Sequence, residues 1–304
     1  MEELNARLVR ARDGMRIRCA TWPADGPARP RGVCALLDGQ TEFLEKYSEV
    51  VGELRARGFT VAALDWRGQG GSMRALPDAL KAHVGDFEEY DDDLETFLEQ
   101  VVRPLSEKPP LALAHSMGGH ILLRTLHDKP NAFAAAIMTA PMLQADTRGY
   151  PGWLARLVCH AHNLRGVSTD WVWGMQQRDP LKMSFDDNRV TSDRTRFARA
   201  QSALRANPNI RLAGPTWGWL EAAYHSWDRV MAPGYAEAIS TPVLMIGAGR
   251  DRIVNTAAER EFARRLPKGT YLEFADAEHE ILMESDSIRA RFWVAFDAFV
   301  DSVL

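Results

Sequence analysis

The chain has 304 residues, of which 46% are hydrophobic and 26% are charged, a globular composition that excludes a disordered, collagen-like or coiled-coil protein. The formal net charge of −4 argues against a protein that binds nucleic acid, because such proteins usually carry a basic surface. The three cysteines are too few and too scattered for a disulfide framework or a zinc site, and they fit a reducing compartment, so we expect a cytoplasmic protein.

The N-terminal residues do not predict a targeting segment. Residues 1–14 carry charges throughout and contain no apolar run, so we expect no signal peptide. The longest apolar stretches, such as residues 132–138, are far shorter than the roughly 18 residues that a membrane span needs. We therefore expect at most peripheral contact with a membrane.

The first 140 residues alternate short apolar runs with longer amphipathic segments. The apolar runs predict strands over residues 32–37, 59–64, 111–114 and 134–139. The amphipathic segments predict helices over residues 47–57, 86–102 and 117–127. An alternation of this kind predicts a mostly parallel sheet that is covered by helices on both faces.

The alternation stops near Ala145 and resumes near residue 236. Between these points lie six of the nine tryptophans, and from Ala145 to Val230 twelve Lys and Arg stand against eight Asp and Glu. Beyond this segment we predict strands over residues 242–246 and 270–274 and helices over residues 256–266 and 287–303. The pattern predicts an α/β core of residues 1–144 and 236–304, with residues 145–235 inserted as a helical cap.

Ser116 is the strongest candidate for a nucleophile. It stands where a buried strand ends and a helix is expected to begin, in a turn that differs from the nucleophile elbow Gly-x-Ser-x-Gly only by Ala114 in the first glycine position. The turn requires small residues two before and two after the serine, here Ala114 and Gly118, because strand and helix approach closely. The alternative is a serine in an ordinary glycine-rich turn.

A serine nucleophile needs a base, and the base needs an acid that orients it. In the chain order Ser, Asp, His, the candidates are Asp251, just after the strand over 242–246, and His279, after the strand over 270–274. One helix and one strand separate the two residues, so both are expected at the carboxyl edge of the sheet beside Ser116. Asp276 lies in the wrong loop for the acid, and the side chain of His115 should point away from the hydroxyl.

An oxyanion hole for this serine would need two backbone N–H donors. One is expected from Met117, which follows the serine at a helix N-terminus. The other is expected from the loop of residues 38–42, where Gln40 is the best candidate.

The glycine-rich segment of residues 65–72 can be interpreted in two ways. It could be a phosphate-binding loop, but no Gly-Lys-Ser/Thr or complete Gly-x-Gly-x-x-Gly pattern accompanies it. A structural corner of the fold is therefore favoured, and Ser72 is not expected to be a nucleophile. Because no HExxH motif or other spaced cluster of ligands is present either, we expect no metal and no cofactor.

Several segments together carry a resemblance to a known family: the serine turn, DGQTEFLEKYSEV, DWRGQGGS, GAGRDRIV and AEHEILME. They resemble the α/β-hydrolase superfamily, and more narrowly its lysophospholipase and monoacylglycerol-lipase-like branch, from about residue 10 to the C-terminus. The resemblance implies Ser116 as nucleophile, Asp251 as acid, His279 as base, and Gln40 and Met117 as oxyanion donors. The chain departs from this pattern at Asp38-Gly39, where relatives often have His-Gly or Pro-Gly.

The function implied is hydrolysis of carboxylic esters of single-chain lipids, either lysophospholipid or monoacylglycerol, through an acyl-enzyme on Ser116. Trp217 and Trp219 either line the pocket for the acyl chain or belong to a small core inside the cap. A general carboxylesterase or thioesterase is the main alternative, and a non-catalytic protein that binds acyl ligands is a further one. The expected partner is a small lipid ester, and the sequence leaves the oligomeric state open.

Overall fold

The computed structural model describes residues 5–25, 30–145 and 151–304. Residues 1–4 of the charged N-terminal stretch and residues 146–150 of the predicted cap therefore lie outside the described part. Within that part, eight strands form one sheet, whose order from edge to edge is β1 (Ala6–Arg10), β2 (Arg16–Trp22), β4 (Phe59–Leu64), β3 (Gly32–Leu37), β6 (Leu111–His115), β7 (Ala135–Thr139), β9 (Val243–Ala248) and β10 (Gly269–Phe274).

The sheet is mostly parallel, as the sequence predicts. Every neighbouring pair from β4 to β10 runs parallel, while β2 pairs antiparallel with both β1 and β4. The carboxyl ends of the parallel strands consequently meet at one edge of the sheet, which is where open α/β sheets place their sites.

Helices cover both faces of the sheet, and the alternation of side chains along β3 shows how. Val33, Ala35 and Leu37 point into one apolar cluster, while Cys34 and Leu36 point into the other. The first cluster is completed by the helices α2 (Glu88–Phe97), α3 (Met117–Asp128) and α7 (Thr256–Arg265). The second is completed by α1 (Ser48–Ala56) and α8 (Asp286–Val303). The strands are buried on both faces, which explains why they read as continuous apolar runs.

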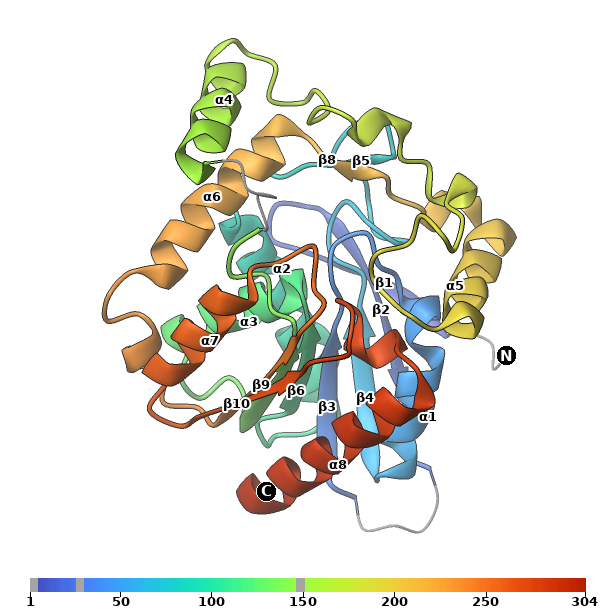
Figure 1. Ribbon diagram of the computed structural model, residues 1–304. Helices are drawn as coiled ribbons and strands as arrows, with labels where there is room; N and C mark the ends of the chain where they lie inside the picture. Colours follow the sequence, from blue (N-terminus) through green and yellow to red (C-terminus); the bar gives the residue numbers. More distant parts are fainter. Residues whose placement is uncertain (1–4, 26–29, 146–150) are drawn as a thin grey trace.

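Between β7 and β9 the chain leaves the sheet and forms the helices α4 (Gly152–Leu164), α5 (Arg194–Ala206) and α6 (Trp217–Met231). We use the name cap for residues 151–235. Figure 1 shows α4 and α6 at the top of the view, at the end of the molecule opposite α8. A small parallel pair, β5 (Lys81–Ala82) with β8 (Gly214–Pro215), joins the cap to a loop of the core.

Two features differ from the sequence prediction. The edge hairpin of β1 and β2 was not predicted, because its strands alternate arginines with apolar residues and are half exposed, so they lack a continuous apolar run. The helix predicted over 86–102 ends at Phe97, and a π-helical turn (Leu98–Val102) and a 3₁₀ turn (Arg103–Leu105) follow. Pro104 removes a backbone donor there, so the α-helix cannot continue through it.

Gly118 is where α3 comes closest to β3. A β-carbon at this position would lie 2.4 Å from the carbonyl oxygen of Asp38 and 2.5 Å from that of Leu37. Both contacts are with backbone atoms, which cannot rotate away as a flexible side chain could. The small residue expected two positions after Ser116 is therefore required by the packing of the helix on the end of β3.

The substitution Gly118→Ala should lower the free energy of unfolding by about 1–3 kcal/mol, because the extra methyl group overpacks a rigid contact. Urea unfolding of the variant measures this loss. Gly152→Ala is the matched control, since a β-carbon at Gly152 meets no atom within 4 Å, and alanine there should be neutral or stabilising. Equal stability of the two variants would contradict the proposed close approach.

Candidate active site

Ser116 lies in a strained turn between β6 and α3. Its φ angle is +50°, in the left-handed region that a residue with a side chain rarely adopts. Backbone hydrogen bonds hold the turn: the Ser116 N–H donates to the Thr139 carbonyl at 3.1 Å, and the Ser116 carbonyl accepts from the N–H groups of His120 at 3.1 Å and Met142 at 3.0 Å. The strain is thus supported by α3 and by the strand end of β7.

The structure brings Ser116, His279 and Asp251 into one chain of hydrogen bonds. Ser116 Oγ lies 3.0 Å from His279 Nε2, and His279 Nδ1 lies 2.6 Å from Asp251 Oδ2. The other carboxylate oxygen of Asp251 accepts from the backbone N–H groups of Ile253 at 2.7 Å and Val254 at 3.0 Å. All three site side chains are buried, so their relative positions are fixed by the loops that follow β6, β9 and β10.

The pKa of Asp251 is set by two opposing effects. Burial alone would raise it, but the neighbouring His279 and the two backbone N–H groups prevail and hold the pKa below its ordinary value. Asp251 is therefore ionised, and its charge favours the proton of His279 on Nδ1. This arrangement leaves Nε2 free to accept the proton of the Ser116 hydroxyl.

The loop of residues 38–42 lies directly against Ser116. A β-carbon at Gly39 would be 2.8 Å from Glu42 Oε2 and 3.1 Å from Ser116 Cβ, so the absence of a side chain lets the loop lie this close. The Gly39 carbonyl accepts from Gln69 Nε2 at 2.7 Å. Because a trans peptide is planar, the N–H of Gln40 points to the side opposite that carbonyl. Met117 supplies a second N–H at the first position of α3, where helical amides have no partner within the helix.

Glu42 holds the same loop from the inside. Its Oε2 accepts from the Gly39 N–H at 2.5 Å and from the Tyr47 hydroxyl at 2.7 Å, and its Oε1 accepts from Lys46 Nζ at 2.6 Å. Burial would raise the pKa of Glu42, but Lys46 and the hydrogen bonds lower it to about 2. Glu42 is therefore ionised in its buried position and fixes the peptide that precedes Gln40.

Lys46 connects this loop to the loop that carries His279. Its ammonium group lies 2.6 Å from Glu42 Oε1 and 2.6 Å from Glu280 Oε1. Burial would lower the pKa of Lys46, but the two carboxylates raise it above its ordinary value. A single cation thus joins the candidate oxyanion loop to the residue that directly follows His279.

The acidic residue that departs from the family pattern, Asp38, is buried, and its surroundings favour the neutral form of its carboxyl group. Its carbonyl accepts from Trp66 Nε1 at 2.9 Å and its Oδ1 from Gln69 Nε2 at 3.4 Å, while Oδ2 has no partner among the described residues. Burial, and then the nearby carboxylates of Asp65 and Glu42, raise the pKa of Asp38 well above its ordinary value. In its neutral form this carboxyl group does not repel the negative charge that an oxyanion would bring.

Asp276 and His115, the alternatives to Asp251 and His279 in the sequence, form hydrogen bonds or ion pairs with other residues. Asp276 pairs with Arg291 at the surface, at 2.5 Å. His115 Nδ1 lies 3.0 Å from the carbonyl oxygen of Thr139, and burial lowers the pKa of His115 to about 4, so its ring is neutral. The His115 ring nevertheless packs beside the His279 ring, with ring centroids 4.8 Å apart, and so forms part of the surroundings of His279.

The segment of residues 65–72 is a structural corner. Asp65 Oδ2 accepts from the Gly71 N–H at 2.7 Å and from Arg18 Nε at 2.5 Å. The Ser72 hydroxyl donates to the Asp65 carbonyl at 2.6 Å and accepts from the Arg18 N–H at 2.7 Å. The loop therefore wraps around its own aspartate, and the Ser72 hydroxyl is fully used.

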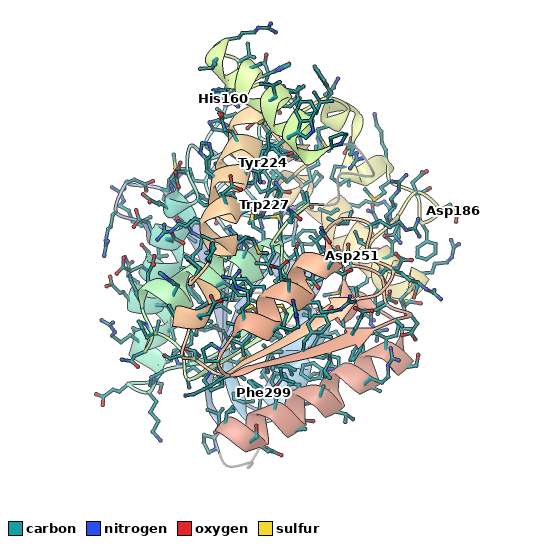
Figure 2. All side chains as sticks on the ribbon, turned by 60° about the vertical axis from the view of Figure 1, so that its left-hand side comes forward. His160, Asp186, Tyr224, Trp227, Asp251 and Phe299 are labelled. Carbon is teal, nitrogen blue, oxygen red and sulfur yellow. The ribbon has the colours of Figure 1, made fainter. Side chains whose placement is uncertain are left out.

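Trp217 and Trp219 both lie on α6 but in different surroundings. Trp219 Nε1 donates to the Tyr90 hydroxyl on α2 at 3.0 Å. Trp217 packs inside the cap, with ring centroids 4.2 Å from His162 and 5.2 Å from Trp173. Figure 2 shows another tryptophan of α6, Trp227, above Asp251.

Sequence reasoning missed the side chains that support the site. Glu42 and Lys46 stand in the segment that carries the family resemblance, and their spacing of four residues on one side of a turn was an available signal for an ion pair. Gln69 was not singled out, because it lies in the glycine-rich segment that was predicted to be a structural corner. Nothing in the sequence links Lys46 to Glu280.

A mostly parallel sheet, helices on both faces and a serine in a strained turn after a central strand define the class of α/β hydrolases. Comparison with known families is more specific. Residues 28–286 match the family Hydrolase_4, described as serine aminopeptidase, S33, and the chain belongs to this family. The fold predicted from the sequence and the resemblance to an α/β hydrolase are thereby confirmed.

Among curated proteins, the chain is similar to lysophospholipase L2 of Escherichia coli, with 32% identity over 277 residues that cover 88% of this chain and 79% of that protein. It is also similar to a monoacylglycerol lipase of Mycolicibacterium smegmatis, with 25% identity, 83% of this chain and 81% of that protein. Among solved structures, a monoglyceride lipase of Saccharomyces cerevisiae has the same fold, with a TM-score of 0.74, 17% identity, and 100% and 98% coverage.

The substitution Asp38→Asn tests the neutral state of this residue. A carboxyl whose pKa is raised on folding binds its proton more tightly in the folded state, so its contribution to stability falls as the pH rises above its ordinary value of 3.8. Asparagine does not titrate. The melting temperature of the variant relative to the original chain should therefore increase from pH 5 to pH 8, by about 2–4 °C for each kcal/mol of difference.

Asp92→Asn, at a half-exposed position where the carboxylate lies 3.8 Å from Arg12, is the control for the loss of an aspartate as such. Its melting temperature relative to the original chain should change little between pH 5 and pH 8. If Asp38→Asn showed the same flat profile, Asp38 would be ionised at neutral pH.

Proposed function

We propose that Ser116 is the nucleophile, His279 the base and Asp251 the orienting acid of a hydrolase that cleaves carboxylic esters of single-chain lipids. The single observation that carries this proposal is the hydrogen-bond chain, with 3.0 Å from Ser116 Oγ to His279 Nε2 and 2.6 Å from His279 Nδ1 to Asp251 Oδ2. The ionised, doubly anchored Asp251 supports it, because an orienting acid must keep its charge and its position.

The geometry supports acyl transfer in two steps. Ser116 Oγ attacks the ester carbonyl carbon while its proton passes to His279 Nε2, and the N–H groups of Gln40 and Met117 stabilise the negative oxygen that forms. The alcohol then leaves with the proton from Nε2, and an acyl group remains on Oγ. Water attacks this acyl-enzyme by the same route, with His279 again taking the proton, and the free acid leaves.

The lipid assignment is supported by the relatives. The E. coli protein is named a lysophospholipase and the M. smegmatis protein a monoacylglycerol lipase, and each covers more than four fifths of this chain. Both names describe esters with one acyl chain. In this proposal residues 1–144 and 236–304 form the hydrolase core, and residues 145–235 are an insertion whose cap lies over the acyl site. Trp217 and Trp219, which are both buried on α6, are its proposed lining.

We also propose that the outer face of α4 touches the lipid surface. Trp153, Leu157 and Leu164 are 67%, 57% and 76% exposed, and their spacing of four and seven residues places them on one side of the helix. Figure 2 shows α4, marked by His160, outermost on the cap. The excess of basic residues from Ala145 to Val230 suits an anionic surface.

No helix among the described residues is long and apolar enough to cross a bilayer. Contact through α4 would therefore be peripheral. The three cysteines, Cys19, Cys34 and Cys159, are buried free thiols. They support the proposal that the protein works in the reducing cytoplasm, at the inner surface of the membrane.

Replacing the nucleophile should remove the activity. Ser116→Ala should lower kcat by about 10⁵–10⁶-fold and Asp251→Asn by about 10⁴-fold, because the second change leaves the base present but in the wrong tautomer. The measurement is the hydrolysis of lysophosphatidylcholine, monoacylglycerol and a short ester. A fluorophosphonate probe should label the original chain at Ser116 and leave Ser116→Ala unlabelled.

Rapid cleavage of the short ester with neither lipid touched would replace the lipid assignment by a general carboxylesterase. Failure of the probe to label Ser116 in the folded original chain would instead favour a protein that only binds acyl ligands.

The membrane proposal has its own test. The double substitution Trp153→Ser with Leu157→Ser should weaken binding to anionic vesicles by at least about tenfold, since each side chain contributes roughly 1.5–3 kcal/mol when it leaves water. Vesicle sedimentation measures the effect. Val294→Ser on α8 is the control, because Val294 is also exposed but lies at the far end of the molecule. Equal binding of both variants would remove α4 from the interface.

A further inference from the structure

The loop that carries His279 is held by a carboxylate outside the hydrogen-bond chain of the site. Glu284 has no exposed surface, yet no lysine or arginine side chain pairs with its carboxylate among the described residues. Its carboxyl oxygens are held by hydrogen-bond donors instead. Oε1 accepts from the Glu278 N–H at 2.9 Å, and Oε2 accepts from the Ser285 N–H at 3.2 Å. Glu284 thus closes the loop around His279.

The remaining donors to Glu284 come from the cap. The Ser192 N–H donates to Oε1 at 3.2 Å, and the Ser192 hydroxyl donates to Oε2. One oxygen atom of Glu284 therefore binds the residue before His279 and a residue of the cap at the same time. A buried carboxylate that loses such donors is left unsatisfied, which is costly, so the two segments stabilise each other.

Further hydrogen bonds run between the same two segments. The Glu280 N–H donates to the Val190 carbonyl at 2.7 Å, and the Thr191 hydroxyl donates to the Met283 carbonyl at 2.6 Å. The residues directly before and after His279 are thus both hydrogen-bonded, one to Glu284 and the other to the cap. This leaves the backbone of His279 little freedom to shift.

The cap segment is itself anchored to the core. Arg196, at the start of α5, forms ion pairs with Glu49 of α1 at 2.7 Å and with Asp286 of α8 at 2.6 Å, and it donates to the Glu284 carbonyl at 2.8 Å. Figure 1 shows α5 beside α1 and the loop that leads into α8. The cap segment that is hydrogen-bonded to the His279 loop is therefore itself held against α1 and α8.

We propose that Glu284 and residues 190–193 form a latch that positions His279 for proton transfer, so that this part of the cap supports the base rather than covering the acyl chain. Glu284, Thr191 and Ser192 are positioning residues in this scheme. The inference rests on the proposed role of His279. A displacement of about 1 Å at such a group costs on the order of a hundredfold in rate, which gives the latch its importance.

If residues 190–193 only covered the acyl chain, as a roof, the effect of a substitution there on kcat and KM would depend on the acyl length of the ester. The latch predicts that it does not. A roof touches only a long acyl chain, so damage to it raises KM for a lipid ester and spares a short one. The latch acts on the proton transfer that every ester needs. Damage to the latch should therefore lower kcat for an acetyl ester and for a long-chain monoacylglycerol by the same factor, with KM unchanged.

Thr191→Val is the main test, because valine keeps the shape of threonine but removes the hydroxyl, and with it the bond to the Met283 carbonyl and the bond that Oγ1 accepts from the Asp193 N–H at 3.0 Å. We expect kcat to fall about ten- to a hundredfold on both p-nitrophenyl acetate and a long-chain monoacylglycerol. Thr191→Ser keeps a hydroxyl group and should restore kcat to within about threefold of the original value. Ser192→Ala removes one hydroxyl from Glu284 and should act in the same direction.

Ser202→Ala on α5 is the matched control. Ser202 lies in the same part of the cap, is exposed, and donates only to the Ala198 carbonyl of its own helix. Its loss should leave both rates unchanged. Circular dichroism and the melting temperature identify folded variants, and if Thr191→Val does not fold, Ser192→Ala decides the question.

The latch is overturned if a folded Thr191→Val or Ser192→Ala loses activity only on the long-chain ester, or loses none, or if Thr191→Ser fails as badly as Thr191→Val. The rate of fluorophosphonate labelling of Ser116 separates this failure from that of the proposed function. An original chain that is labelled and hydrolyses both esters keeps the function, whatever the latch variants do.

Discussion

The backbone of Ser116 carries the constraint on which the site depends. A left-handed φ on a residue with a side chain costs about 1–3 kcal/mol, so it persists only where the surroundings enforce it. Here the φ angle of Ser116 is held by hydrogen bonds to the end of β7 and to Met142. The close packing of Gly118 against the end of β3 holds it as well. Because β6, β7, β9 and β10 run parallel, the loops with Asp251 and His279 open at the same edge.

Around this turn the molecule buries charge rather than excluding it. Glu42, Lys46 and Glu280 form a nearly buried ionic bridge, and burial beside these carboxylates raises the pKa of Asp38. Removing one member of such a group would leave its partner unpaired in a medium that solvates it poorly, which is strongly destabilising. The geometry of the candidate oxyanion loop and of the His279 loop is therefore fixed by the same ions, although Gln40 and Met117 are the residues proposed to bind the oxyanion.

The sequence predicted what is encoded locally. The apolar strands, the small residues around Ser116 and the order of Ser116, Asp251 and His279 all leave patterns within short windows. The hairpin of β1 and β2 was missed because its arginines conceal the alternation. The bond between Ser192 and Glu284 joins residues 92 positions apart, and two polar side chains that meet only in the folded chain leave no periodic signal.

The bridge through Lys46 has a consequence for the order of events during synthesis. Lys46 is made early, whereas Glu280 and His279 belong to the last tenth of the chain. Until the segment with His279 and Glu280 has been made, Ser116 lacks its proposed base and Lys46 lacks one of its two counter-ions. The proposed hydrolase would therefore gain its activity only after the segment with Glu280 has folded against Lys46.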